Sequence, residues 1–237
     1  MAVTITIREV TGQSIKAAPD ETILYLVRHG YGSHNAYAAS VTQPPCNCRT
    51  GGSCAYINDA HVDARLIEKG RRQAVAAGCT LRSLSPAPVI AYVSPLRRTL
   101  ETASIALGGA GGTGPSLDLP LVACEWIREV FGVHHCDRRG PVADARAEWP
   151  AVDYSAVGTE EDSWHKEDVR ETVEEAAARA TRFLLHVRAR PERVVVAVTH
   201  SAFLREMLTH AVVVEEGHSE VRRRFATGEE IKTKINT

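Results

Sequence analysis

The sequence predicts a three-layer α/β/α sandwich with a mostly parallel central sheet. Its 237 residues suffice for one sizeable domain with a buried core, and no change in composition divides residues 1–237 into two. Short apolar runs without polar alternation are typical of strands that are covered on both faces. Helical patterns lie between these runs, and strands that alternate with helices favour a layered α/β fold.

Four apolar runs are the predicted strands. Residues 23–27, 89–93 and 194–198 are uninterrupted runs of apolar or aromatic residues. Residues 119–123 form the weakest run because they contain Pro120. Proline lacks a backbone N–H, so this run fits only an edge strand or the start of a strand.

Three helices are predicted between and after these strands. Residues 96–107 place apolar side chains at helical spacing and end before a glycine pair. Residues 169–187 form a longer apolar stripe opposed by charged residues, and Pro191 stops it. A third helix, residues 201–211, is expected directly after His200.

Three stretches fit no regular element. Residues 36–62 contain Pro44-Pro45 and Gly51-Gly52 and are predicted to be a loop insertion within the single domain. Residues 108–114 are a glycine-rich connection. The tail from Glu215 mixes charges without a period, so we expect a frayed or partly ordered end there.

Composition excludes several classes of partner. The formal net charge of −1 provides no basic field for nucleic acid or an acidic membrane. No apolar run is long enough to span a membrane, and residues 1–16 lack the apolar block of a signal peptide. We therefore expect a cytoplasmic protein whose six cysteines are thiols. The oligomeric state stays open.

Polar side chains follow each predicted strand where it ends. The carboxyl ends of strands in an open parallel sheet meet at one edge, which is where ligands bind. Two histidines, up to three arginines and two carboxylates would therefore gather there. The segments are Arg28-His29-Gly30 with Asn35, Ser94-Pro95-Leu96-Arg97-Arg98, Glu125 with Glu129, and Thr199-His200-Ser201.

These residue types suit phosphoryl transfer. A neutral imidazole attacks phosphorus without needing a strong base, and guanidinium groups bind phosphate oxygens in pairs. A second histidine, protonated in an anionic setting, would add charge, and the amides at Ser201 would face an oxyanion. A buried carboxylic acid would protonate the leaving oxygen. No metal or cofactor is expected.

The order of these motifs resembles that of the histidine phosphatase superfamily, also called phosphoglycerate mutase-like proteins. The resemblance implies His29 as the nucleophile, with Arg28, Arg98 and His200 around the phosphate and Asn35 as a further contact. Arg98 is preferred to Arg97 because the arginine of the family falls four positions after the serine. The matching landmarks are Leu26-Val27-Arg28-His29-Gly30 with Asn35, Leu66 to Gly70 with Gln73-Ala74, Ser94 to Arg98 with Thr102-Ala103, and Val198-Thr199-His200-Ser201.

The resemblance also bears on the general acid and on the branch of the family. The acid of the family often lies shortly before a glycine, which maps to Glu129 before Gly132, with Glu125 as the alternative.

Residues 132–139 differ from the Arg-His-Tyr-Gly segment of glycolytic mutases and look like the plant and fungal mutase-like proteins. This pattern favours hydrolysis of a small phosphomonoester through phosphohistidine. The alternatives are mutase-type transfer and a catalytically silent protein that binds phospholigands.

Several other residues allow two interpretations. Arg97 is expected to be structural, whereas the loop arginines are equally consistent with a second anion site and with a solvated surface. The remaining histidines are expected to be bystanders at the pocket mouth. The loop arginines are Arg138 and Arg139, and the histidines at the pocket mouth are His34, His134 and His135.

The cysteines of the insertion invite a zinc hypothesis. Cys46, Cys48 and Cys54, completed by His61, would supply four ligands. The one-residue spacing and the missing second pair weigh against this reading. Exposed thiols on a flexible insertion are the favoured interpretation, with redox-sensitive pairing as the alternative.

Overall fold

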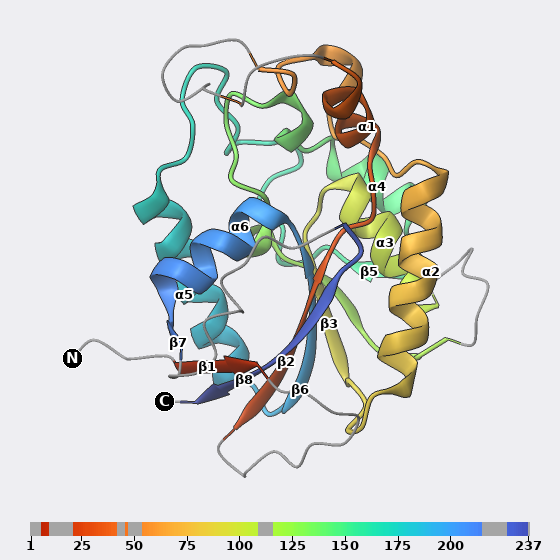
Figure 1. The fold of residues 1–237 in the computed structure, drawn as a ribbon, viewed down its shortest axis with the longest axis vertical. Helices are drawn as coiled ribbons and strands as arrows, with labels where there is room; N and C mark the ends of the chain where they lie inside the picture. The colour runs from red at the N-terminus through yellow and green to blue at the C-terminus, as the bar shows by residue number, and fades with distance from the viewer. Residues whose placement is uncertain are drawn as a thin grey trace.

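A mixed sheet forms the centre of the fold. The computed structural model describes residues 6–9, 21–41, 46, 54–108, 116–214 and 227–236. Within them the strand order is β5-β4-β3-β6-β2-β8-β1-β7 (Figure 1). The five strands from β5 to β2 are parallel, as predicted for the centre of the sheet. The strands are β1 (Thr6–Glu9), β2 (Thr22–Arg28), β3 (Ile90–Val93), β4 (Leu121–Ala123), β5 (Val152–Asp153), β6 (Val194–Thr199), β7 (Val213–Val214) and β8 (Glu230–Asn236).

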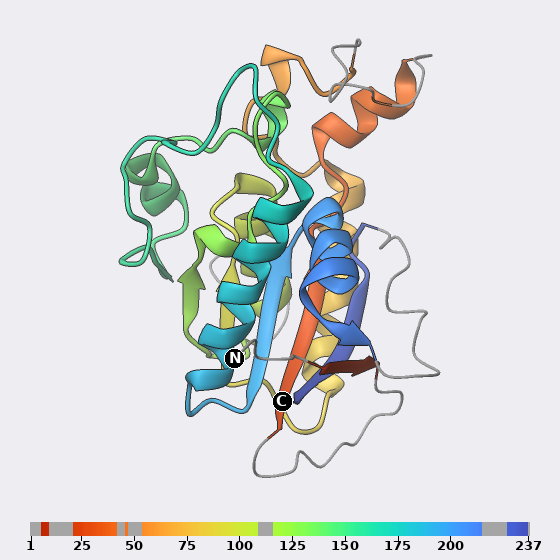
Figure 2. The same ribbon diagram turned by 90° about the vertical axis from the view of Figure 1, so that its left-hand side faces the viewer.

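Helices cover both faces of this sheet, which confirms the three-layer prediction. Helices α5 and α6 lie on one side and α2 and α3 on the other (Figures 1 and 2). No helix in the described part of the chain is long and apolar enough to cross a membrane. The helices are α1 (Ser33–Ser40), α2 (Glu68–Ser83), α3 (Arg97–Leu107), α4 (Val142–Glu148), α5 (Val173–Ala189) and α6 (Ser201–Glu206), which continues as the π-helix η5 (Met207–Ala211), with 3₁₀ turns η2 (Asp59–His61), η3 (Glu125–Ile127) and η4 (His135–Asp137).

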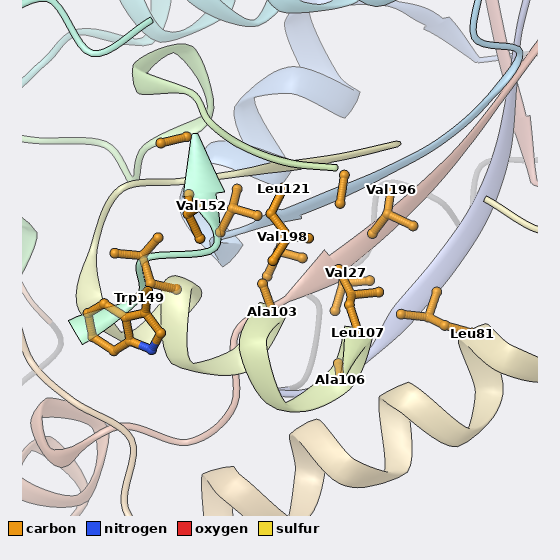
Figure 3. Close-up of a cluster of buried hydrophobic side chains, with 14 of the residues drawn as sticks. Val27, Leu81, Ala103, Ala106, Leu107, Leu121, Trp149, Val152, Val196 and Val198 are labelled. Atoms are coloured by element: carbon orange, nitrogen blue, oxygen red, sulfur yellow. The ribbon is translucent and has the colours of Figure 1, made fainter. Parts of the chain in front are cut away.

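The continuous apolar runs are explained by two separate cores. Leu24 and Leu26 of β2 pack in the cluster that contains residues of α5 and α6. Val27 of the same strand packs in the other cluster, where Val198 of β6 faces Ala103 of α3 (Figure 3). Successive side chains of a strand point to opposite faces, so both faces of these strands need apolar residues.

The charged tail is more ordered than the frayed or partly ordered end expected from Glu215 onward. Residues 230–236 form β8, which pairs antiparallel with β2 and with β1, so this part of the tail is not frayed. Just before it, Gly228 donates its N–H to the carbonyl of His29 at 3.0 Å, and Glu229 accepts from the N–H of Arg28 at 2.9 Å. The end of β2 is therefore hydrogen-bonded on both sides, to β6 and to the segment that begins β8. Residues 215–226 lie outside the described residues.

The predicted loop insertion and helix boundaries also need adjustment. Residues 33–40 form α1, so the predicted loop begins at residue 41 rather than 36, and the 3₁₀ turn η2 lies near its end. Helix α5 begins only at Val173, because Thr172 and Glu175 form a capping box there. Residues 42–45 and 47–53, including Cys48, lie outside the described residues, as do residues 109–115 of the glycine-rich connection.

Helix α2 was not among the predicted helices although it bears one of the matched motifs. Its buried stripe includes Ala74, Ala77 and Leu81, and small residues give a weak apolar signal.

Pro120 precedes β4 and accepts a hydrogen bond from the Ala91 N–H, which confirms its place at the start of a strand. The helix following His200 occurs where expected, although its second half is a π-helix.

Gly30, in the segment after β2, and Gly70 of α2 allow these two parts of the chain to approach closely. A Cβ atom on Gly70 would lie 2.3 Å from the carbonyl oxygen and 2.6 Å from the nitrogen of Tyr31. Both are backbone atoms, which cannot move aside as a flexible side chain can, so Gly70→Ala is expected to reduce the free energy of unfolding by about 1–3 kcal/mol. Chemical denaturation measures this. Gly158→Ala is the matched control, because nothing lies within 4 Å of its added Cβ; equal stability of the two variants would contradict the close approach.

Candidate active site

A pocket of about 560 Å³ opens at the carboxyl ends of the parallel strands. It is the site predicted from the motifs that follow those strands. Most of the predicted residues line it, namely Arg28, His29, Asn35, Arg98, Glu129 and Ser201. His200 is the exception, since it is fully buried and lies behind His29 with 5.1 Å between the ring centroids.

The geometry of His29 selects one tautomer. Its Nδ1 lies 2.7 Å from the carbonyl oxygen of Gly30, which only accepts hydrogen bonds, so Nδ1 carries the proton. The lone pair of the ring is therefore on Nε2. Burial, together with the charges of Arg98 and Arg28, holds the pKa of His29 well below its ordinary value of 6.5. A neutral imidazole with a free lone pair is the form that acts as a nucleophile.

His200 differs from the expected cation. Its Nδ1 accepts from Nε of Arg98 at 3.2 Å, so Nε2 carries the proton and donates to Oγ of Ser94 at 2.8 Å. Burial and the charge of Arg98 hold the pKa of His200 well below 6.5, and the ring is neutral. This neutral state differs from the protonated histidine expected beside an anion. What His200 does here is position Arg98.

Arg98 is held on three sides and is 1% exposed. Besides its bond to His200, it donates from Nη1 to the carbonyl of Cys136 at 2.5 Å and from Nη2 to Oδ1 of Asp137 at 2.8 Å. A guanidinium group has five N–H bonds, so one N–H on each Nη remains. Two such hydrogens on adjacent nitrogens match two oxygens of a phosphate group.

Asp137 is a site residue that the motifs did not reveal. Although burial opposes ionisation, contacts with His134, Arg170 and Arg98 hold the pKa of Asp137 well below its usual value. Its Oδ2 lies 3.1 Å from Nη1 of Arg170, which also lines the pocket. Asp137 therefore fixes two arginines of the pocket at once.

The two candidate acids are in different environments. Glu129 lines the pocket, and its carboxylate accepts from the backbone N–H groups of Phe203 at 2.8 Å and Ala202 at 3.2 Å, at the start of α6. Glu125 is instead enclosed by ion pairs with Arg128 and Arg139 and does not line this pocket. The geometry favours Glu129.

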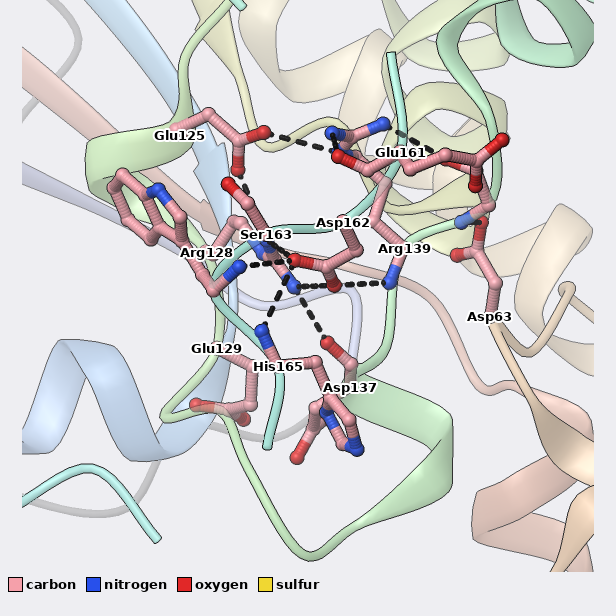
Figure 4. A network of polar contacts seen from close by, with 12 residues as sticks. Asp63, Glu125, Arg128, Glu129, Asp137, Arg139, Glu161, Asp162, Ser163 and His165 are labelled. Atoms are coloured by element: carbon pink, nitrogen blue, oxygen red, sulfur yellow. Dashed lines mark hydrogen bonds and ion pairs between the residues drawn. The ribbon is translucent and has the colours of Figure 1, made fainter. Parts of the chain in front are cut away.

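A buried ionic network supports the loop that bears Glu129 and Asp137. Asp162 lies between Arg128 and Arg139, accepting from Nη2 of the first at 2.5 Å and from the backbone N–H of the second at 2.8 Å (Figure 4). The fully buried Arg128 also donates to the carbonyl of Asp137 at 2.9 Å. These contacts fix the loop to residues 159–165. Removing one partner of such a pair leaves a buried charge uncompensated.

The loop arginines do not form a second anion site in this pocket. Arg139 is buried and donates to Glu125 and to four backbone carbonyls, and Arg138 is exposed and paired with Glu167. Arg97 pairs with Asp63 and Asp144, as expected of a structural residue. The additional pocket arginines are instead Arg170 and Arg205. Arg205 lies one turn after Ser201 on α6, whereas no sequence signal marks Arg170.

His34 also lines the pocket, so it is closer to the site than a bystander at its mouth. Its ring centroid lies 5.7 Å from that of His29. Its Nδ1 is buried and has no hydrogen-bond partner among the described residues. Burial and the charge of Arg98 hold the pKa of His34 well below 6.5.

The buried histidines predict a steep loss of stability in acid. The histidines are His29, His34 and His200. Below pH 6.5 they are protonated in the unfolded chain but not in the folded chain, so the free energy of unfolding decreases as the pH is lowered. Each contributes about 1.4 kcal/mol per pH unit. His34→Gln is therefore expected to reduce the slope by about that amount between about pH 5 and 6. Urea denaturation at each pH measures it. His210→Gln, on a half-exposed side chain, is the control, and an unchanged slope for His34→Gln would refute the assignment.

The cysteines and histidines of the insertion are arranged differently from the zinc hypothesis. Nδ1 of His61 lies 3.2 Å from Oγ of Ser33, and its ring packs on Tyr37. Cys54 is buried, so it is not the exposed thiol expected there, whereas Cys46 is exposed. The ring nitrogen near both sulfurs belongs to His134.

Sequence comparisons relate the chain to known proteins. Residues 24–227 match the family model described as histidine phosphatase superfamily (branch 1). The chain is 34% identical over 223 residues to phosphoglycerate mutase-like protein 1 of Arabidopsis thaliana, covering 84% of this chain and 74% of that one. It is 26% identical over 191 residues to phosphomutase-like protein 3 of Candida albicans, covering 79% and 59%.

Solved structures share the fold at low sequence identity. The α-ribazole phosphatase of Shigella flexneri superposes with a TM-score of 0.55 at 18% identity over 89% of each chain. A mycobacterial glucosyl-3-phosphoglycerate phosphatase gives a TM-score of 0.51 at 21% identity, over 89% of this chain and 92% of that one. At this level of identity the similarity concerns the fold alone.

Proposed function

Because the chain belongs to the histidine phosphatase superfamily, we propose that it hydrolyses a small phosphomonoester through a phosphohistidine on His29. The observation that carries the proposal is the state of His29. Its Nδ1–H is held by Gly30 and its pKa is lowered, so Nε2 bears the lone pair beside Arg28 and Arg98. The resemblance to the plant and fungal mutase-like branch holds in the sequence comparisons as well.

The first step transfers the phosphoryl group to the protein. Nε2 of His29 attacks phosphorus, the bond to the ester oxygen breaks, and the leaving oxygen takes a proton from Glu129. Arg28 and the remaining N–H groups of Arg98 bind the phosphoryl oxygens as negative charge develops on them. The side chain of Asn35 accepts from the Gly32 N–H through Oδ1, which leaves its amide N–H groups to the pocket.

The second step returns the enzyme to its starting state. A water molecule gives a proton to the carboxylate of Glu129 and attacks phosphorus, and the bond to Nε2 breaks, releasing inorganic phosphate. The backbone N–H groups of Ala202 and Phe203 hold the side chain of Glu129 in place at the pocket. Glu129 is thereby protonated again for the next first step.

The names of the relatives favour a second candidate, mutase-type transfer. There a hydroxyl of a second phosphorylated molecule, rather than water, would take the phosphoryl group from His29. Residues 132–139 of this chain do not match the Arg-His-Tyr-Gly segment of glycolytic mutases. This difference supports hydrolysis.

A product assay separates the two reactions. The protein is incubated with p-nitrophenyl phosphate, and then with 3-phosphoglycerate and 2,3-bisphosphoglycerate, while inorganic phosphate and 2-phosphoglycerate are quantified. Hydrolysis predicts release of phosphate and no 2-phosphoglycerate. Formation of 2-phosphoglycerate faster than phosphate would replace the proposal with the mutase. A screen over sugar phosphates, nucleotides, phosphoglycolate and inositol phosphates then ranks substrates by kcat/KM.

A further inference from the structure

Three ligand atoms of metal-binding type converge at the rim of the pocket. Sγ of Cys46 lies 2.9 Å from Sγ of Cys54, and each sulfur lies 3.3 Å from Nε2 of His134. The three atoms come from two segments that are far apart in the sequence. Cys46 and His134 also line the pocket.

We propose that Cys46, Cys54 and His134 bind one zinc ion. Zinc takes thiolate sulfur at about 2.3 Å and imidazole nitrogen at about 2.0–2.1 Å in a tetrahedral site. Tetrahedral ligands at these lengths lie about 3.6–3.8 Å apart, so the three atoms need to move outward by less than about 1 Å. Binding releases the two thiol protons to solvent, because each sulfur coordinates as a thiolate.

The ligand set selects the class of metal. Two soft thiolates and an imidazole suit zinc and disfavour magnesium and calcium, which require oxygen ligands. Burial differs among the ligands, since Cys54 and His134 are buried and Cys46 is exposed. Such a triad with one exposed member leaves a fourth position for water or another ligand.

The surroundings of His134 fit a metal ligand. Its Nδ1 lies 3.4 Å from Oδ2 of Asp137, a buried carboxylate that also pairs with Arg98 and Arg170. A proton on Nδ1 shared with Asp137 leaves the lone pair on Nε2, which is the atom near the two sulfurs. Carboxylate, histidine and metal in this order are the usual arrangement around protein-bound zinc.

The same contacts connect the metal position to the phosphate pocket. Asp137 binds Arg98 on its other oxygen, and Arg98 in turn binds His200 behind His29. The backbone N–H of His135 also donates to the carbonyl of Tyr56 at 3.0 Å. The ion would thus tie the cysteine insertion to the loop after Gly132, beside the substrate. This inference concerns metal binding and does not depend on the proposed hydrolysis.

The competing arrangement is a disulfide between Cys46 and Cys54. It needs an oxidant and does not use Nε2 of His134, whereas the metal uses all three side chains. Zinc content and the mass of the intact chain distinguish the two. A disulfide lowers the mass by two hydrogen atoms and abolishes binding.

The test is zinc stoichiometry in the whole protein. Protein kept reduced throughout is loaded with one equivalent of Zn²⁺, freed of unbound metal and analysed by elemental mass spectrometry. About one zinc ion per chain is expected, falling to below about a tenth in Cys54→Ser and in His134→Ala. Cys46→Ser is expected to lose the zinc in the same way, and because Cys46 is exposed, this substitution does not disturb the buried core. Cys79→Ser, on an exposed thiol of α2, retains the metal.

Cobalt gives a second readout of the ligands. Co²⁺ added to the metal-free protein is expected to produce a thiolate-to-cobalt charge-transfer band in the wild type and in Cys79→Ser. The band should be lost in Cys46→Ser and Cys54→Ser. Absence of zinc and of the band from reduced wild-type protein would overturn the proposal, and so would retention of a full equivalent of zinc by Cys54→Ser.

Discussion

His29→Ala is expected to abolish turnover while inorganic phosphate still binds. The substitution removes the only atom proposed to bond to phosphorus, whereas Arg28, Asn35 and Arg98 stay in the pocket. Loss of a covalent nucleophile lowers kcat by at least about 10⁴-fold, because the remaining groups bind the phosphate without a path for its transfer. Hydrolysis of p-nitrophenyl phosphate measures kcat, and calorimetric titration with inorganic phosphate measures binding.

The intermediate provides an independent check on this residue. Rapid quenching of the wild type with substrate, followed by mass spectrometry at alkaline pH, should reveal a phosphorylated chain whose label is lost in acid. His210→Ala is the control, since this half-exposed histidine lies outside the pocket and should keep both the rate and the label. Turnover by His29→Ala at the wild-type rate would disprove the mechanism.

Arg98→Lys is expected to have the second largest effect. Lysine keeps the positive charge beside Asp137, but a single ammonium group does not reproduce the fork that contacts His200, Asp137 and the carbonyl of Cys136. Loss of one aligned donor pair to the transferring group costs about 10²–10³-fold in kcat. The unmet contacts also lower the free energy of unfolding by about 1–3 kcal/mol.

The neighbouring arginine makes a matched control. Arg97→Lys changes the same residue type on the same helix, but Arg97 pairs with Asp63 and Asp144 outside the pocket. Its kcat is expected to stay within a few-fold of the wild type. Steady-state kinetics and chemical denaturation of both variants give the comparison. A similar loss of kcat in the two variants would show that Arg98 acts through general stability and not through the phosphate.

The parallel part of the sheet was predictable because burial on both faces leaves an unmistakable pattern. The apolar runs of β2, β3 and β6 need no polar alternation, and their carboxyl ends carry His29, Arg98 and His200. Strand β8 was not predictable in the same way. Its sequence, Glu230 to Asn236, alternates charged with β-branched residues, and its place beside β2 follows from tertiary pairing alone.

The site residues that could not be predicted from the sequence were missed for a similar reason. Motif positions identified the residues at strand ends, whereas Arg170 reaches the pocket from a loop and Asp137 from the short turn η4, and neither segment has a periodic pattern. The metal hypothesis failed on its histidine for the same reason. Proximity in sequence suggested His61, but the fold brings His134 to the sulfurs of Cys46 and Cys54.

The position of β8 has a consequence for biosynthesis. Strand β2 ends at Arg28, yet the neighbour on one of its sides begins only at Glu230. At about 5–20 residues per second, a ribosome needs on the order of ten seconds or more to make the chain between them. During that time the backbone next to the nucleophile has an open hydrogen-bonding edge, which is prone to aberrant association. We therefore expect the nascent chain to acquire its phosphate pocket only after synthesis has passed this strand.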